Sequence, residues 1–154
     1  MNNNDIHMLL KQEFRVMKKG ILLLTLILFS ASSWAEELLI DIPSIVGKSE
    51  SQVSDMIGEP TSCNSIKYGN KCQYKMAETE IVFINGKADW ITVEGLDDKP
   101  FTSATLKHLG LRPVKATFSN AFTLRWESLQ GLRSVSLFKA GNNADYAYIK
   151  AYTK

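Results

Sequence analysis

Residues 81–94, with the sequence IVFINGKADWITVE, carry the strongest local structural signal in the chain. An apolar run ends at Ile84, the pair Asn85-Gly86 follows, and a second strand-like run begins at Ala88. Asn and Gly tolerate the positive backbone angles of a tight two-residue turn, so this spacing is typical of a β-hairpin. The stretch predicts two adjacent antiparallel strands near the middle of the chain.

The segments on both sides of this hairpin predict short helices and further strands. A helix is expected over residues 49–57, because Ser49 and Gln52 have the spacing of a capping box. A second helix is expected over residues 102–109, ending at Gly110. Further strands are expected over residues 66–68, 72–76, 121–127, 134–138 and 144–152.

Two parts of the chain are similar to each other. Residues 83–90 match residues 138–146 with one residue inserted in the second turn, and both contain Ala-Asp followed by an aromatic residue. The match predicts tandem repeats, 42–96 and 97–154, each a helix followed by a meander; a chance similarity is the alternative. The expected fold class is α+β, with short helices packed on one face of an antiparallel β-sheet.

Residues 1–35 predict an N-terminal extension followed by a secretory signal peptide. The basic pair Lys18-Lys19 precedes an apolar run over residues 21–29, and small residues lead to a cleavage site after Ala35. The apolar run is shorter than the roughly 20 residues that span a bilayer. An uncleaved membrane anchor is the alternative.

Residues 36–154 are expected to form a single domain that is periplasmic or secreted, with no stable membrane span after cleavage. Residues 1–16 lack the basic start of a signal peptide, so initiation at Met17 is a hypothesis and initiation at Met1 is the alternative. The domain has two cysteines, Cys63 and Cys72. An even number of cysteines in an exported chain predicts one disulfide, and two separate buried thiols are the alternative.

Composition argues against a polyanionic partner. The chain has 18 Lys plus Arg, 16 Asp plus Glu and 45% hydrophobic residues. The formal charge of residues 36–154 is zero, whereas binding to nucleic acid or to an anionic bilayer needs clustered cations. We expect no nucleic-acid partner.

Catalytic groupings are sparse, so we expect no enzymatic activity. Residues 36–154 contain one histidine, His108, which is expected in the last turn of the second helix, where a cationic ring favours the helix dipole. The closest carboxylate groupings are Asp97 with Asp98 and Glu78 with Glu80, both in predicted loops or turns. A small enzyme that depends on His108 is the alternative.

No cofactor or metal is expected. The glycines are isolated and lack the Gly-x-x-x-x-Gly-Lys pattern of phosphate-binding loops. One histidine and a predicted disulfide leave no cluster of metal ligands. Asp89 and Asp145 each follow a turn in the matched segments, where an Asp side chain accepts backbone N–H bonds, so both are expected to be structural.

Alternation along the last strand of each repeat predicts an aromatic surface on one face of the sheet. Ile91 and Ile149 belong to the apolar side, whereas Trp90 and Tyr148 belong to the other. Tyr and Trp dominate the energetics of protein interfaces. The expected partner-binding residues are Trp90, Tyr146, Tyr148, Tyr152 and Arg125. The alternatives are that these side chains only pair across strands, or that the two faces of the sheet are assigned the wrong way round.

Alternation also assigns the strand over residues 121–127. Phe122, Leu124 and Trp126 are expected on the core side. Arg125 and Glu127 are then expected on the open side, beside the aromatic residues.

Residues 45–53, 56–60 and 82–87 carry a family resemblance. The sequences IVGKSESQV, MIGEP and VFINGK resemble the helix-then-meander module of the SmpA/OmlA (BamE-like) family, and in tandem they resemble the β-lactamase-inhibitor-protein fold. The similarity covers most of residues 42–152. Members of this family are outer-membrane lipoproteins, whereas the first cysteine here is Cys63.

The resemblance implies a protein-binding module of the bacterial envelope with an unidentified partner, acting as an inhibitor of a hydrolase or as a scaffold. Residues 42–49, IPSIVGKS, are similar to the opening of PASTA cell-wall-binding modules. Binding to peptidoglycan or another saccharide of the cell wall is therefore the alternative function.

Overall fold

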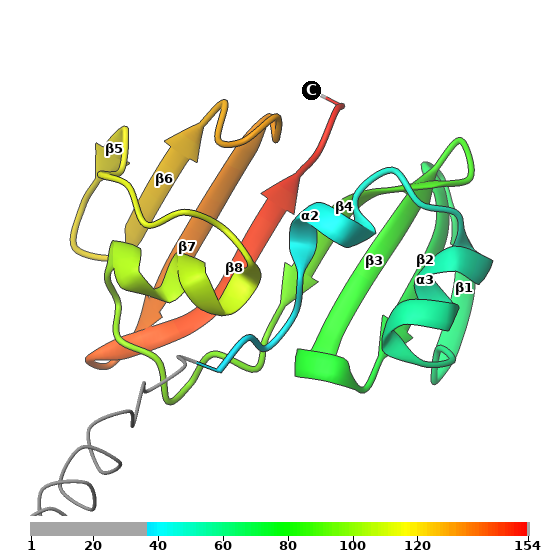
Figure 1. Ribbon diagram of the computed structural model, residues 1–154, viewed down its shortest axis with the longest axis horizontal. Coiled ribbons are helices and arrows are strands. Elements are labelled where there is room, and N and C mark those ends of the chain that lie inside the picture. Colours follow the sequence, from blue (N-terminus) through cyan, green and yellow to red (C-terminus); the bar gives the residue numbers. More distant parts are fainter. Residues whose placement is uncertain (1–36, 154) are drawn as a thin grey trace, which may run out of the picture. The chain divides into compact units, whose positions relative to one another are not determined.

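The computed structural model describes residues 37–153, so the predicted extension and signal peptide over residues 1–35 lie outside the described residues. Eight strands form one antiparallel sheet in the order β1-β2-β3-β4-β8-β7-β6-β5 (Figure 1). The strands are β1 Ser62–Ile66, β2 Gly69–Tyr74, β3 Thr79–Ile84, β4 Lys87–Val93, β5 Phe118–Ser119, β6 Thr123–Glu127, β7 Ser134–Ala140 and β8 Asn143–Lys150. The helical segments are α2 Ile42–Ile45, α3 Glu50–Ile57, and the 3₁₀ turns η1 Met76–Glu78 and η2 Ser103–Leu109.

The predicted α+β class is wrong, because an eight-stranded antiparallel sheet dominates residues 37–153 and the helical segments are few and short. The helical segments of residues 37–153 have 4, 8, 3 and 7 residues. The longest, α3, buries only Val53 completely. Irregular segments supply much of the remaining core, through Ile40, Leu96, Leu111 and Leu132. No helix in the described part of the chain is both long and apolar enough to cross a bilayer.

The hairpin predicted over residues 81–94 is confirmed. Strands β3 and β4 pair in antiparallel fashion on either side of Asn85-Gly86. Asn85 has φ 52° and Gly86 has φ 74°, the left-handed backbone that such a turn requires. Asparagine and glycine are the residues that adopt this conformation at least cost.

Both predicted helix starts and ends are confirmed, although the second helix is a 3₁₀ segment. The Ser49 hydroxyl accepts from Gln52 N, and the Gln52 side chain accepts from Ser49 N, which completes the capping box of α3. Thr102 caps η2 through Ala104 N, and Gly110 ends it with φ 72°. Local signals therefore position these segments correctly.

The predicted disulfide joins Cys63 of β1 to Cys72 of β2. The two residues are directly opposite each other, with their Cα atoms 4.1 Å apart, so the bond ties the edge strand to its neighbour. The same register pairs Ile66 with Gly69 and places residues 67–68 in the turn. The strand predicted over residues 66–68 is therefore wrong.

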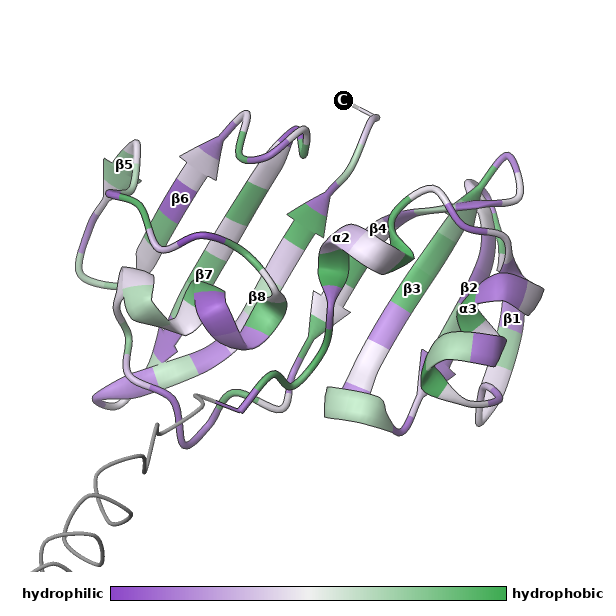
Figure 2. Ribbon diagram, in the orientation of Figure 1, coloured by the Kyte–Doolittle hydropathy of each residue, from purple (hydrophilic) through white to green (hydrophobic). Residues whose placement is uncertain are grey.

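Strands β4 and β8 join the two halves of the sheet. Ile91 lies opposite Ile149 and Val93 opposite Ala147, and all four side chains are fully buried. The predicted apolar side of these strands is thus confirmed. Hydrophobic and hydrophilic residues alternate along the strands in Figure 2.

Each central hairpin contains a register shift. In β3–β4 the shift leaves Asp89 as an extra residue, and a similar shift in β7–β8 falls near Asp145. Asp89 is 4% exposed, and its Oδ1 accepts hydrogen bonds from Tyr152 N, Thr153 N and Thr153 Oγ1. These bonds hold the chain after Lys150, where β8 ends earlier than the predicted residue 152. The division into repeats remains a prediction.

Strand β6 starts two residues later than predicted. Asn120 Oδ1 accepts hydrogen bonds from Phe122 N and Thr123 N, which holds this segment in a turn. Phe122 is consequently 71% exposed, so its predicted core position is wrong. Trp126 is 1% exposed and donates from Nε1 to Val114 O at 2.8 Å, as expected of a core residue.

Reduction of the disulfide should lower the free energy of unfolding by about 2–3 kcal/mol, because opening a short loop increases the entropy of the unfolded chain. Urea unfolding with and without a thiol reductant measures the change. The matched control is Cys63→Ala/Cys72→Ala, which should respond to urea identically in both conditions. An unchanged midpoint of the native chain on reduction would contradict the stabilising role of the bond.

Asp89→Ala should lower the free energy of unfolding by about 1–3 kcal/mol, because it removes the acceptor of three hydrogen bonds. Hydrogen exchange should accelerate at the amides of Tyr152 and Thr153. The matched control is Asp145→Ala in the other hairpin, where the half-buried carboxylate has no ion pair within the described residues. Equal effects of the two substitutions would show that Asp89 has no special role.

Candidate functional site

The candidate site is the face of the sheet opposite the core, which we call the open face. In Figure 1, α2, α3 and η2 lie in front of the sheet, so the open face is turned away from the viewer. Strand registers arrange its side chains in two rows that cross the sheet. The first row is Gln73, Glu80, Thr92, Tyr148, Ser136, Arg125 and Phe118, and the second is Lys71, Val82, Trp90, Lys150, Ser134 and Glu127.

The open face carries two groups of aromatic rings. The rings of Tyr68 and Trp90 are 5.0 Å apart and tilted, and those of Phe138 and Tyr146 are stacked at 4.5 Å. The Nζ atom of Lys150 lies 5.5 Å from the Trp90 ring and 5.9 Å from the Tyr148 ring. The lysine therefore connects the Trp90 pair to Tyr148.

Trp90 is oriented by the C-terminal segment. Its Nε1 donates to Thr153 Oγ1 at 2.6 Å, and that hydroxyl donates to Asp89 Oδ1 at 3.2 Å. The buried carboxylate thus supports the indole through one intermediate residue. An aromatic side chain held in this way loses little rotamer freedom when a partner binds.

Tyr148 lies at the centre of the first row. Desolvation by its neighbours, followed by the nearby Asp89 carboxylate, raises the pKa of the Tyr148 phenol above its ordinary value. The phenol stays protonated at neutral pH and can donate a hydrogen bond. Its half-buried position leaves part of the side chain accessible.

The structure brings together four of the five predicted partner-binding residues. Trp90, Tyr146, Tyr148 and Arg125 all lie on the open face. Tyr152 does not share their surface, because it follows the end of β8 and its hydroxyl lies beside Gly47, where a Cβ atom would be 2.9 Å from it.

Tyr68, Phe138 and Lys150 were not among the predicted binding residues. Phe138 follows Ser134 and Ser136 at alternate positions of β7, so strand alternation predicts that it lies on the open face with them. Tyr68 lies in a turn, and its contact with Trp90 joins residues 22 positions apart in the sequence. No local pattern indicates such a contact.

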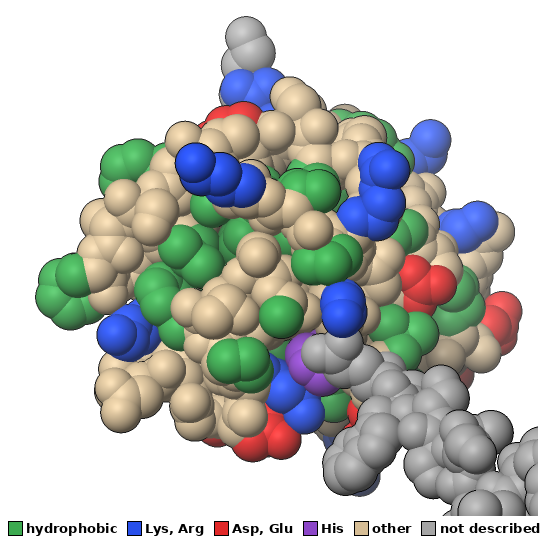
Figure 3. Space-filling view, turned by 60° about the vertical axis from the view of Figure 1, so that its left-hand side comes forward, with side chains coloured by type: hydrophobic (Ala, Val, Ile, Leu, Met, Phe, Trp, Pro, Cys, Tyr) green, Lys and Arg blue, Asp and Glu red, His purple; other side chains and the backbone are tan. Residues whose placement is uncertain are grey.

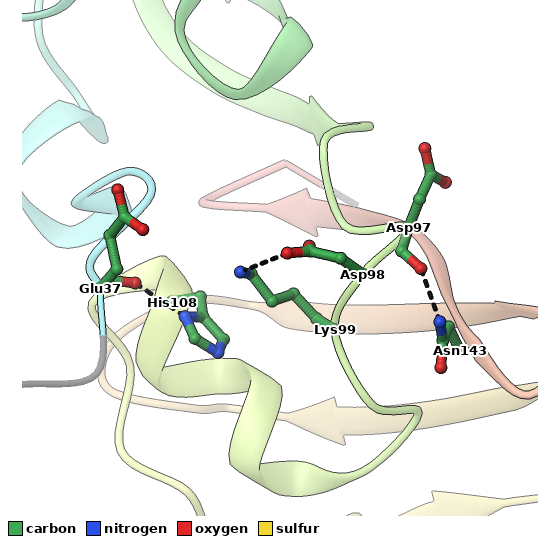
Figure 4. Close-up of polar contacts among 6 residues, drawn as sticks. All are labelled: Glu37, Asp97, Asp98, Lys99, His108 and Asn143. Carbon is green, nitrogen blue, oxygen red and sulfur yellow. Dashed lines mark hydrogen bonds and ion pairs between the residues drawn. The ribbon is translucent and has the colours of Figure 1, made fainter. Parts of the chain in front are cut away.

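His108 lies at the end of η2, on the core side of the sheet. It is 7% exposed, and its Nδ1 lies 2.7 Å from Glu37 O (Figure 4). The His108 carbonyl accepts from Leu39 N and Ile40 N. These bonds give the residue a structural role in anchoring the first described residues to η2.

The two candidate carboxylate groupings are separate: Glu78 and Glu80 line one depression together with Glu94, and Asp97 and Asp98 do not line it. Asp97 and Asp98 are exposed, and their neighbours engage different atoms: Asn143 Nδ2 donates to Asp97 O, and Lys99 pairs with the Asp98 carboxylate at 2.9 Å (Figure 4). The hydrogen bond from Lys99 lowers the pKa of Asp98 from its usual value. Glu80 pairs with Lys71 at 2.9 Å.

One cluster of potential metal ligands occurs among residues 37–153, formed by Glu50, Cys63 and Cys72. Both sulfur atoms belong to the disulfide, and the Cys63 sulfur lies 3.5 Å from Glu50 Oε1. A disulfide provides no thiolate, which is the form of cysteine that binds metal. The cluster is part of the covalent link between β1 and β2.

Exposed hydrophobic side chains mark the end of the sheet formed by β5 and β6. Phe118 is 50% exposed and Val114 is 42% exposed, in addition to Phe122. Figure 3 brings this side of the molecule forward and shows hydrophobic side chains at the surface, with Lys and Arg among them. The Arg125 guanidinium carbon lies 6.0 Å from the centre of the Phe118 ring, which links this end to the open face.

Comparisons with known proteins identify no relative. No family model matches the chain, and no curated protein or solved structure matches it. The resemblance to the SmpA/OmlA and inhibitor-protein modules therefore rests on the quoted residues alone.

Proposed function

We propose that the chain is an exported, non-enzymatic protein-binding module that binds its partner through the open face. The observation that carries this proposal is an eight-stranded sheet whose open face presents accessible aromatic side chains. Tyr and Trp combine a large apolar area with a polar tip and lose little entropy when they are ordered. Such residues form the anchors of protein interfaces.

The contacts of the rings favour a protein over a saccharide. A sugar ring stacks on the free face of an aromatic side chain. Here Trp90 already contacts Tyr68 and Lys150, and Phe138 is stacked on Tyr146. The half-buried rings and the neighbouring cation suit the mixed apolar and polar surface of a protein.

The cellular role belongs to the same proposal. The signal-peptide pattern of residues 1–35 supports a periplasmic or secreted location, where a disulfide is stable. The resemblance to envelope modules supports a scaffold role or the inhibition of a hydrolase. We place the module in the bacterial envelope on these grounds.

The test is affinity capture with the oxidised chain, using a native envelope extract and identification of retained proteins by mass spectrometry. Trp90→Ala/Tyr146→Ala/Tyr148→Ala should lose a protein that the native chain retains. Truncation of interface anchors costs about 2 kcal/mol or more each, or about 30-fold in affinity. Thermal unfolding should establish that the variant is folded.

Tyr152→Ala is the matched control, because it removes an exposed tyrosine that lies off the open face. This control should retain the same protein as the native chain. Identical retention by all three forms would refute the proposal. Cosedimentation with purified peptidoglycan that depends on Trp90 and Tyr148 would instead establish the cell-wall function.

A further inference from the structure

The open face contains a basic depression over strands β6, β7 and β8. Its volume is about 340 Å³. The charged residues that line it are Arg125, Arg133, Lys150 and Glu127, with Ser136 and Tyr148 among the uncharged ones. Three cations therefore surround one carboxylate in a chain whose residues 36–154 have no net formal charge.

The three cations have no carboxylate partner within residues 37–153. The ion pairs found among the described residues are formed by Lys71 and Lys99, which do not line the basic depression. Arg125 Nε donates to Ser136 Oγ at 3.1 Å, and Lys150 lies over the Trp90 and Tyr148 rings. Neutral partners hold Arg125 and Lys150 in place, and the depression as a whole has two more cations than carboxylates, which favours an anion.

The charge differs between two depressions of the sheet. A second depression, at the β3 and β4 side, is lined by Glu78, Glu80 and Glu94 together with Lys75. The two depressions thus have opposite excess charges on the same sheet. A partner with an acidic segment is attracted to one of them and repelled by the other, which specifies where it binds.

We propose that the basic depression binds an acidic segment of the partner protein, with carboxylate side chains held by Arg125, Arg133 and Lys150. This inference rests on the proposed protein-binding function and specifies the chemistry of the partner. Guanidinium groups match the two oxygens of a carboxylate. Phe118, beside Arg125, provides apolar area for the neighbouring side chains of the segment.

A direct test is fluorescence anisotropy of the full chain with a labelled ten-residue peptide of alternating Glu and Leu. A peptide of alternating Gln and Leu is the matched probe. The Glu peptide should bind at least about tenfold more tightly, as expected for charge-assisted hydrogen bonds. Arg125→Gln/Arg133→Gln should remove this difference, whereas Glu127→Gln should strengthen binding of the Glu peptide by about two- to threefold.

The control variant is Arg112→Gln/Lys115→Gln, which removes the same net charge from a loop on the core side of the sheet. This loop is placed there by the bond from the buried Trp126 to Val114 O. The variant should bind the Glu peptide within about twofold of the native chain. Equal weakening by both double variants would overturn the inference, because net charge alone would then explain the binding.

Other outcomes separate this inference from the proposed function. Equal affinity for the Glu and Gln peptides would overturn the acidic-segment inference. Peptidoglycan cosedimentation that depends on Arg125 and Arg133 would assign the depression to a saccharide, and self-association lost in Arg125→Gln/Arg133→Gln would assign it to a second copy. If capture requires the aromatic residues and not the two arginines, the proposed function stands and the inference fails.

Discussion

The pairing of β4 with β8 is the interaction on which the rest of the structure depends. It joins β1–β4 to β5–β8 and buries Ile91, Val93, Ala147 and Ile149 at the centre of the core. Residues more than 50 positions apart meet in this ladder, so its loop-closure cost must be offset by burial of apolar area. Without this pairing the chain would contain two four-stranded meanders, and β4 and β8 would become exposed edge strands.

The same pairing creates the candidate site. Across the open face it places Trp90 opposite Lys150 and Thr92 opposite Tyr148. The core side of each strand supplies stability, and the alternate residues supply a continuous polar and aromatic surface. Asp89 couples the two sides, because its buried carboxylate holds Thr153, which in turn holds the Trp90 indole.

The incorrect fold class illustrates how local signals can mislead. Capping residues identify where α3 and η2 begin and end, and these boundaries were predicted well. They do not show how much of the core a helix covers. That quantity depends on segment length and on irregular residues such as Ile40 and Leu111, which bury as deeply as the strands without any periodic pattern.

The sequence by itself determined the features whose interactions are close along the chain. The Asn85-Gly86 turn, the capping box at Ser49 and the pairing of the two cysteines all depend on short separations or on a forced choice of partner. Strand alternation also assigned Trp90, Tyr148 and Trp126 to their sides of the sheet.

Tertiary structure decided the composition of the site. The hydrogen bond from Tyr152 N to Asp89 holds Tyr152 outside β8 and off the open face. The strand order brings Arg125 and Arg133 beside Lys150. Tyr68 reaches Trp90 only because β1 and β2 pair next to β3 and β4. These contacts join distant residues through the geometry of the sheet, and no local sequence pattern encodes such contacts.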